Sequence, residues 1–167
     1  MSSQSDIRWT LSSFDSLNVR GLYALLQLRA EVFVVEQNCA FQDLDGSDPL
    51  AMHLQGSIGD ELVAYTRCFG PGVKFAEASI GRIVTRDSRR RSGIGHVLVG
   101  RAMTSVGELW GRQAIRIGAQ ARLARFYQGH GFSDAGVPYI EDGIDHLEML
   151  WHPQPRTPET LNTPQRK

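Results

Sequence analysis

Residues 80–99 read IGRIVTRDSRRRSGIGHVLV, and this stretch decides the fold. A strand runs into a glycine-bearing, arginine-rich turn, which opens an apolar helix at Ile94. The first N–H groups of a helix have no partner within it, and the helix dipole favours an anion there. Gly93 and Gly95 allow the backbone to approach an anion closely, and Arg90 can add a forked, charge-assisted hydrogen bond. The stretch therefore predicts a phosphate site between a strand and a helix.

Two common phosphate-binding motifs do not fit this turn. A Walker loop requires GxxxxGK[ST], and the turn contains no lysine. A dinucleotide fingerprint GxGxxG requires glycine at position 98, where the chain has Leu98. A surface arginine cluster beside an ordinary helix start is the remaining alternative, because short motifs recur by chance.

A second motif occurs downstream, where residues 126–132 read FYQGHGF. Together with the RxxGxG pattern of residues 90–95, it resembles the paired signatures of the GNAT superfamily of N-acetyltransferases. Two motifs at the right separation are much more specific than either alone.

Three further segments, residues 28–39, 43–46 and 139–149, are similar to the ElaA-like branch of that superfamily. Asp145 departs from the proline expected in this branch, which concerns the loop near His146 and leaves the expected fold unchanged.

Hydrophobic periodicity predicts a strand, a helix, three strands, a helix, a strand, a helix and two closing strands. The expected strands are 7–11, 51–57, 61–69, 78–85, 114–119, a segment from 132 and 144–151, and the expected helices are about 17–36, 94–110 and 121–128. The order and the resemblance imply an α/β (α+β three-layer) fold of the GNAT acyl-CoA N-acyltransferase type. Its central sheet is mixed and mostly antiparallel, with helices on both faces.

The length and composition predict one domain followed by a tail. The chain has 167 residues, of which 41% are apolar, and this suffices for one core. We expect residues 1–151 to form a single domain. Four of the seven prolines lie in the polar segment 152–167, which we expect to be disordered.

Charge and residue usage argue against several classes of protein. Eighteen basic residues balance 18 acidic ones, so neither a nucleic-acid partner nor a membrane surface is expected. Cys39 and Cys68 have no paired spacing, which suits a reducing cytoplasm. The chain shows no signal-peptide pattern and no apolar stretch of the ~20 residues that span a membrane. The five histidines are scattered, so no metal site is expected.

The resemblance implies acetyl-CoA as co-substrate. It places the pantetheine arm against the backbone of Ile83, Val84 and Thr85, with the N–H of Val84 as the oxyanion donor. The pyrophosphate would lie at the turn and the helix start. The candidate residues there are Arg89, Arg90, Arg91, Ser92, Gly93, Ile94, Gly95 and His96, and Tyr127 is also expected to contact the cofactor.

The resemblance also makes Tyr127 the general acid that protonates the departing thiolate, whereas a packed core tyrosine is the alternative. The base is less determined: His146 is one candidate, beside His53, Glu36, Glu141 and a water chain. A covalent role for Cys39 is disfavoured, because no His/Asp pair can be assigned to it. The acidic segment Asp43, Asp45 and Asp48 is expected to be a solvated loop, with attraction of a cationic amine as its functional alternative.

The expected function is transfer of an acetyl group from acetyl-CoA to a primary amine by direct attack in a ternary complex. The acceptor would be a small molecule or a peptide, and the protein a monomer or homodimer. A non-catalytic acyl-CoA sensor or interaction module is the alternative. Nucleic-acid binding through the arginines of the turn ranks last, because the chain has no net positive charge.

Overall fold

The structure is a computed structural model that describes residues 6–155. The strands are β1 (Arg8–Ser13), β2 (Met52–Ile58), β3 (Glu61–Phe69), β4 (Ala78–Thr85), β5 (Ile115–Gln120), β6 (Ser133–Glu141) and β7 (Ile144–Trp151). The main helices are α1 (Val19–Arg29), a π-helix, η3 (Ala30–Glu36), α2 (Ile94–Trp110) and α3 (Ala124–Gln128). Short 3₁₀ turns are η2 (Phe14–Ser16), η4 (Asp48–Leu50), η5 (Asp87–Arg89) and η6 (Ala121–Leu123).

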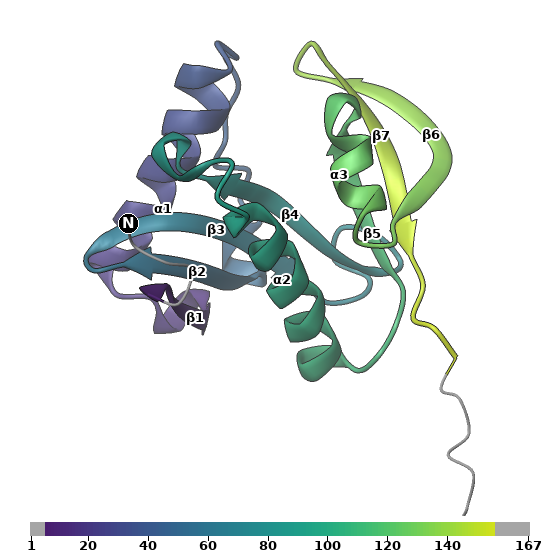
Figure 1. Ribbon diagram of the computed structural model, residues 1–167, viewed down its shortest axis with the longest axis horizontal. Helices are drawn as coiled ribbons and strands as arrows, with labels where there is room; N and C mark the ends of the chain where they lie inside the picture. The colour runs from purple at the N-terminus through teal and green to yellow at the C-terminus, as the bar shows by residue number, and fades with distance from the viewer. Residues whose placement is uncertain (1–5, 156–167) are drawn as a thin grey trace, which may run out of the picture.

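The strands form one sheet in the order β1-β2-β3-β4-β5-β7-β6 (Figure 1). Neighbouring strands are antiparallel except β4 and β5, which run parallel. This mixed, mostly antiparallel sheet with its helices confirms the expected fold class.

Two buried clusters cover the two faces of the sheet. Leu98 and Val106 of α2 belong to the larger cluster, together with Ala64 of β3. Leu28 of α1 belongs to the smaller one, together with Tyr65. Because successive side chains of a strand point to opposite faces, the neighbours Ala64 and Tyr65 show that α1 and α2 pack on opposite sides. The sheet is therefore the middle layer.

Most element limits agree with those expected from the sequence, and β3, β4, α2 and β7 agree to the residue. The first helix differs. It begins at Val19, capped by the side chain of Asn18, which accepts a hydrogen bond of 2.7 Å from the N–H of Gly21. From Ala30 the chain continues as a π-helix. The hydrophobic pattern of the sequence predicts a helix there but does not show which type of helix it is.

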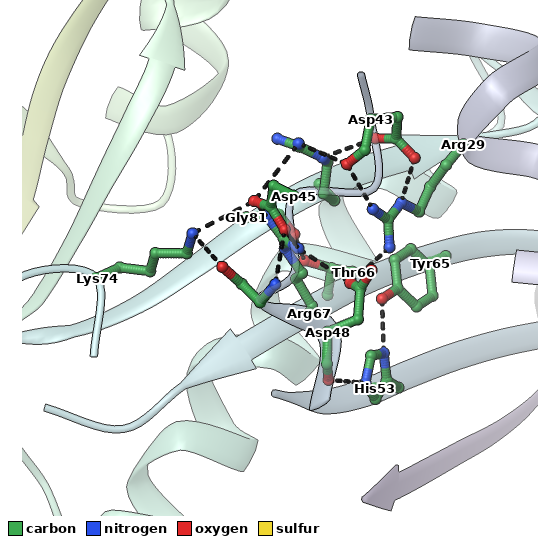
Figure 2. A network of polar contacts seen from close by, with 12 residues as sticks. Arg29, Asp43, Asp45, Asp48, His53, Tyr65, Thr66, Arg67, Lys74 and Gly81 are labelled. Carbon is green, nitrogen blue, oxygen red and sulfur yellow. Dashed lines mark hydrogen bonds and ion pairs between the residues drawn. The ribbon is translucent and has the colours of Figure 1, made fainter. Parts of the chain in front are cut away.

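The acidic loop differs from expectation at two of its three carboxylates, whereas Asp45 is exposed as expected. Asp43 and Asp48 are only 4% and 6% exposed. Arg29 of α1, which is fully buried, donates hydrogen bonds to both: from Nε to Asp43 (2.9 Å) and from Nη1 to Asp48 (2.7 Å) (Figure 2). Arg67 of β3 contacts Asp48 (2.9 Å) and Asp45 (2.6 Å). Asp43 and Asp48 are thus neutralised within the protein, whereas Asp45 is exposed and pairs with Arg67 and Lys74.

Most of the tail expected from His152, residues 156–167, lies outside the described residues. Residues 152–155 have no regular secondary structure, and the carbonyl of Gln154 accepts a hydrogen bond from Arg112 (2.5 Å). Within residues 6–155, no helix has the length and apolar character needed to cross a membrane.

We predict that Arg29→Met lowers the free energy of unfolding by about 3–5 kcal/mol, because it removes the fully buried cation that Asp43 and Asp48 share and leaves each carboxylate with fewer partners. Urea unfolding measures the loss. Arg20→Met makes the same change at an exposed position of the same helix and should shift the free energy by less than about 0.5 kcal/mol. Equal effects of the two substitutions would contradict the importance of the buried pairs.

Candidate active site

A cleft opens where β4 and β5 part. These strands pair only at their first residues, Ala78 with Ile115 and Ser79 with Arg116, and then diverge. The gap belongs to a cavity of about 830 Å³ that is lined by residues of η3, β4, α2, β5, α3 and the β6–β7 hairpin. A parallel pair that separates after two residues leaves one edge of β4 facing this cavity.

A β-bulge shapes β4 beside the cleft. Tyr65 of β3 pairs with Val84, whereas Arg67 pairs with Gly81, so Arg82 and Ile83 both stand opposite one residue of β3. Past the bulge, the N–H of Arg86 donates to the carbonyl of Val63 on β3 (2.8 Å).

This hydrogen bond also determines the direction of the neighbouring amides. Successive amides of a strand point to opposite sides, so the N–H of Val84 points to β3 like that of Arg86, and the Thr85 amide points away from β3. The geometry therefore does not support the N–H of Val84 as an oxyanion donor, although Val84 does line the cavity.

The phosphate turn has the predicted form. Gly93 is the N-cap of α2 with a left-handed φ of 83°, and the first helical hydrogen bond runs from Val97 N–H to its carbonyl. The amides of Ile94, Gly95 and His96 consequently have no partner within the helix. Ser92 and Ile94 do not line the cavity; Ile94 is buried in the core and could offer a ligand only its backbone. The other predicted residues of the turn that line it are Arg89, Arg90, Arg91, Gly93, Gly95 and His96.

Arg90 is already paired in this structure. Its Nη1 and Nη2 donate to the two carboxylate oxygens of Glu36, at the end of η3, and Nη2 also contacts the carbonyl of Thr85 (3.3 Å). The hydrogen bond from Arg90 lowers the pKa of Glu36, which therefore stays ionised and is a poor proton acceptor. A phosphate group would have to share Arg90 with Glu36 or displace it.

The comparisons with known proteins agree with this geometry. The family model of the GNAT acetyltransferase domain matches residues 52–152, which is more than half of the chain. The chain belongs to the GNAT superfamily. It is 40% identical to the protein ElaA of Escherichia coli over 145 residues, which cover 86% of this chain and 95% of ElaA, so it lies in the ElaA-like branch.

Solved structures lead to the same conclusion. An acyl-CoA N-acyltransferase from Pseudomonas aeruginosa superposes with a TM-score of 0.83 at 38% identity, covering 87% of this chain and 99% of that one. The crystal structure of E. coli ElaA gives 0.82 at 38% identity, with the same coverage of both chains. An aminoglycoside 6'-N-acetyltransferase complexed with coenzyme A, at 19% identity and a TM-score of 0.66, shares the fold. This GNAT protein is accordingly an acyltransferase with a CoA-binding fold.

Tyr127 of α3 lines the cavity but is 6% exposed. Its ring packs edge-on against Phe126 (5.1 Å between centroids) and Phe132 (6.2 Å). Among the described residues, no hydrogen-bond partner is recorded for its hydroxyl. Burial raises the pKa of Tyr127 to about 12, so the phenol carries its proton at neutral pH. It therefore carries a proton in the cleft, although the raised pKa makes the phenol a weaker acid than a solvated tyrosine.

His146 of β7 lines the same cavity. Its Nδ1 is 2.7 Å from the carbonyl of Ile144, which can only accept, so Nδ1 carries the hydrogen and the lone pair is on Nε2. Nε2 is 3.8 Å from Glu141, and the ring stacks on Tyr139 with 5.2 Å between centroids. This tautomer is the one that accepts a proton at Nε2.

The other candidate bases are less suitable. Both ring nitrogens of His53 are bonded, to the Tyr65 hydroxyl (2.7 Å) and the Asp48 carbonyl (2.9 Å), and it does not line the cavity. Glu141 lines the cavity but is exposed. Cys39 lines it too, with Sγ 3.3 Å from the carbonyl of Asp142 and no histidine partner recorded among the described residues.

The sequence reasoning missed Tyr139, although it lies in the segment that resembles the ElaA-like branch. A Cβ added to Gly118 of β5 would lie 2.2 Å from its hydroxyl oxygen, so the Tyr139 phenol rests directly on that glycine. A glycine in the middle of a strand is the signal that could have indicated such a close approach. Within residues 6–155, no group of three or more His, Cys, Asp or Glu side chains is placed to hold a metal.

We predict that Gly93→Val weakens CoA binding by about tenfold or more, because a branched side chain is strained at positive φ and the turn must move. Gly111→Val is the matched control at the other end of α2, where φ is 85° and no atom lies within 4 Å of an added Cβ. Both variants should lose thermal stability, and only the first should lose affinity in calorimetric titrations. Equal affinities would place the phosphate elsewhere.

Proposed function

We propose that the protein is an N-acetyltransferase that moves the acetyl group of acetyl-CoA to a primary amine by direct attack in a ternary complex. One observation carries the proposal. The free amides at the start of α2, the unpaired edge of β4, the Tyr127 phenol and the His146 imidazole all border one cavity. Family membership supports the acyl transfer, and the cavity supports the roles of the residues.

The donor would lie along β4. Its pyrophosphate would accept hydrogen bonds from the amides of Gly95 and His96, where the helix dipole favours negative charge. Its pantetheine amides would pair with the edge of β4 at Ile83–Thr85, as an added strand does. The thioester would then lie between β4 and β5, where no strand fills the gap.

The reaction needs one proton taken and one supplied. The amine nitrogen attacks the thioester carbonyl carbon, and the C–S bond breaks as the C–N bond forms. Nε2 of His146 would accept the proton that the amine loses, and the Tyr127 hydroxyl would supply a proton to the departing thiolate. An oxygen and a nitrogen group that line the same cavity would allow both transfers without a covalent intermediate on the enzyme.

A protein that only senses acyl-CoA would retain the cleft without turnover. The buried Tyr127 phenol and the base-competent tautomer of His146 favour the enzyme, because binding alone requires neither. Thiol release from acetyl-CoA, followed across a panel of amine acceptors, distinguishes the two. Tight acetyl-CoA binding without thiol release for any acceptor would favour the sensor.

We predict that Tyr127→Phe folds normally and binds acetyl-CoA with little change, while the rate of transfer falls by roughly 10²-fold, the usual scale for losing a general acid. The measurement is single-turnover acetyl transfer with an acceptor found in the panel. Tyr23→Phe makes the same change at an exposed position of α1 and should leave the rate unchanged. An unchanged rate in the Tyr127 variant would remove the phenol from the mechanism.

A second prediction concerns His146→Gln. Loss of the acceptor at Nε2 should lower the rate of transfer by about 10²-fold, while acetyl-CoA binding changes little. Single-turnover acetyl transfer measures the rate. His152→Gln, at an exposed position outside the cavity, should retain the wild-type rate. An unchanged rate in the His146 variant would assign the proton to another acceptor, such as water.

A further inference from the structure

Arg82 has a backbone conformation that side chains rarely adopt. Its φ is 48°, in the left-handed region, although it lies within β4 and carries a long side chain. Left-handed backbone is unfavourable for any residue with a Cβ, so surrounding contacts must hold it. Arg82 is also one of the two residues that form the bulge beside the cleft.

Hydrophobic burial alone does not select this bulge. Val84 is 3% exposed and packs under α1, opposite Tyr65. Without the bulge, the regular pairing that starts at Gly81 would continue residue by residue and place Ile83, not Val84, opposite Tyr65. Ile83 and Val84 are both β-branched and aliphatic, so this slipped register would also fill the site under α1 with an apolar side chain. Another interaction has to distinguish the two registers.

The side chain of Arg82 supplies that interaction. Its Nε donates to the Asp43 carboxylate (2.8 Å), its Nη2 donates to the Asp43 carbonyl (3.0 Å), and the guanidinium lies 5.6 Å from the Phe41 ring centroid. Asp43 is itself immobilised by Arg29, which bonds its other carboxylate oxygen and the same carbonyl (2.9 and 3.1 Å) (Figure 2). In the slipped register, position 82 would leave the left-handed region and this anchor would be lost.

We propose that Arg82 is a positioning residue: its ion pair with Asp43 holds the bulge in β4 and so keeps the edge of Ile83–Thr85 open to the cofactor. The cofactor role rests on the proposed function, whereas the bulge itself exists without a ligand. Asp43 thereby acts on β4 through Arg82, in addition to Asp45 and its partner Arg67, which line the cavity themselves.

Two substitutions at position 82 separate this role from ordinary stability. Arg82→Ala removes the anchor and disfavours positive φ, so the strand should slip. Arg82→Gly removes the same anchor but also removes the penalty against positive φ, so the bulged register should stay populated. Glycine normally weakens a strand relative to alanine, so better function of the glycine variant would not arise from general stability. Arg116→Ala is the control: its side chain is 21% exposed against 22% for Arg82, and it bridges Glu77 and Glu148 away from the cavity.

The first readout needs no ligand. In Arg82→Ala, the Thr85 amide should become protected from hydrogen exchange, because the slipped register turns it toward β3, and the Val84 and Arg86 amides should lose protection. The same amides should be close to wild type in Arg82→Gly and Arg116→Ala. If the wild type failed to bind CoA, the proposed function would fail, and this comparison would still decide how the bulge is held.

The second readout is titration with CoA, and kcat against KM for acetyl-CoA where an acceptor is known. Arg82→Ala should bind CoA at least about tenfold more weakly. This factor corresponds to the free-energy cost of left-handed backbone, converted into a change in affinity, and the defect should appear mainly in KM. Arg82→Gly should recover to within about threefold of wild type. Unchanged exchange and affinity in Arg82→Ala would overturn the proposal. Equal losses in both Arg82 variants with unchanged exchange would also overturn it, because Arg82 would then act by direct contact.

Discussion

The fully buried guanidinium of Arg29 is the constraint on which much of this structure depends. A charge without exposed surface requires carboxylates of fixed geometry, and Arg29 obtains them from Asp43 and Asp48 in a loop that would otherwise be free. Those carboxylates in turn hold Arg67 of β3 and Arg82 of β4. One loop thus joins a helix on one face of the sheet to two of its central strands.

The pairing of arginines with carboxylates also makes the stability of the acidic loop depend on pH. The hydrogen bond from Arg67 holds the pKa of Asp45 well below its usual range. A carboxyl group with a depressed pKa in the folded state adds stability above its unfolded pKa, and this stability is lost as the pH falls. The loop should therefore be most firmly held at neutral pH and should loosen in acid.

Backbone strain is concentrated around the cleft. The non-glycine residues with positive φ in the described part of the chain are Asn38, Arg82, Arg91 and Asp142. Three of them line the cavity, and Asn38 lies between the lining residues Gln37 and Cys39. Strained conformations persist only where the surroundings hold them, and they cluster at functional sites. At Arg82 the holding contacts can be named, and they lead back to Arg29 through Asp43.

The sequence by itself determined those features of the protein that depend on neighbouring residues. The limits of β3, β4, α2 and β7, the free amides after Gly93 and the two superfamily motifs depend on residues close together in the chain, so periodicity and turn residues predict them. The tertiary structure alone decided the burial of Asp43, the pairing of Arg90 with Glu36 and the position of Tyr139 on Gly118. Each of these joins residues far apart in sequence, and whether a charge is solvated or buried depends on which partners the fold brings to it. A loop with buried carboxylates and a loop with solvated ones look the same in sequence. The three arginines that pair with Asp43 and Asp48 come from α1, β3 and β4.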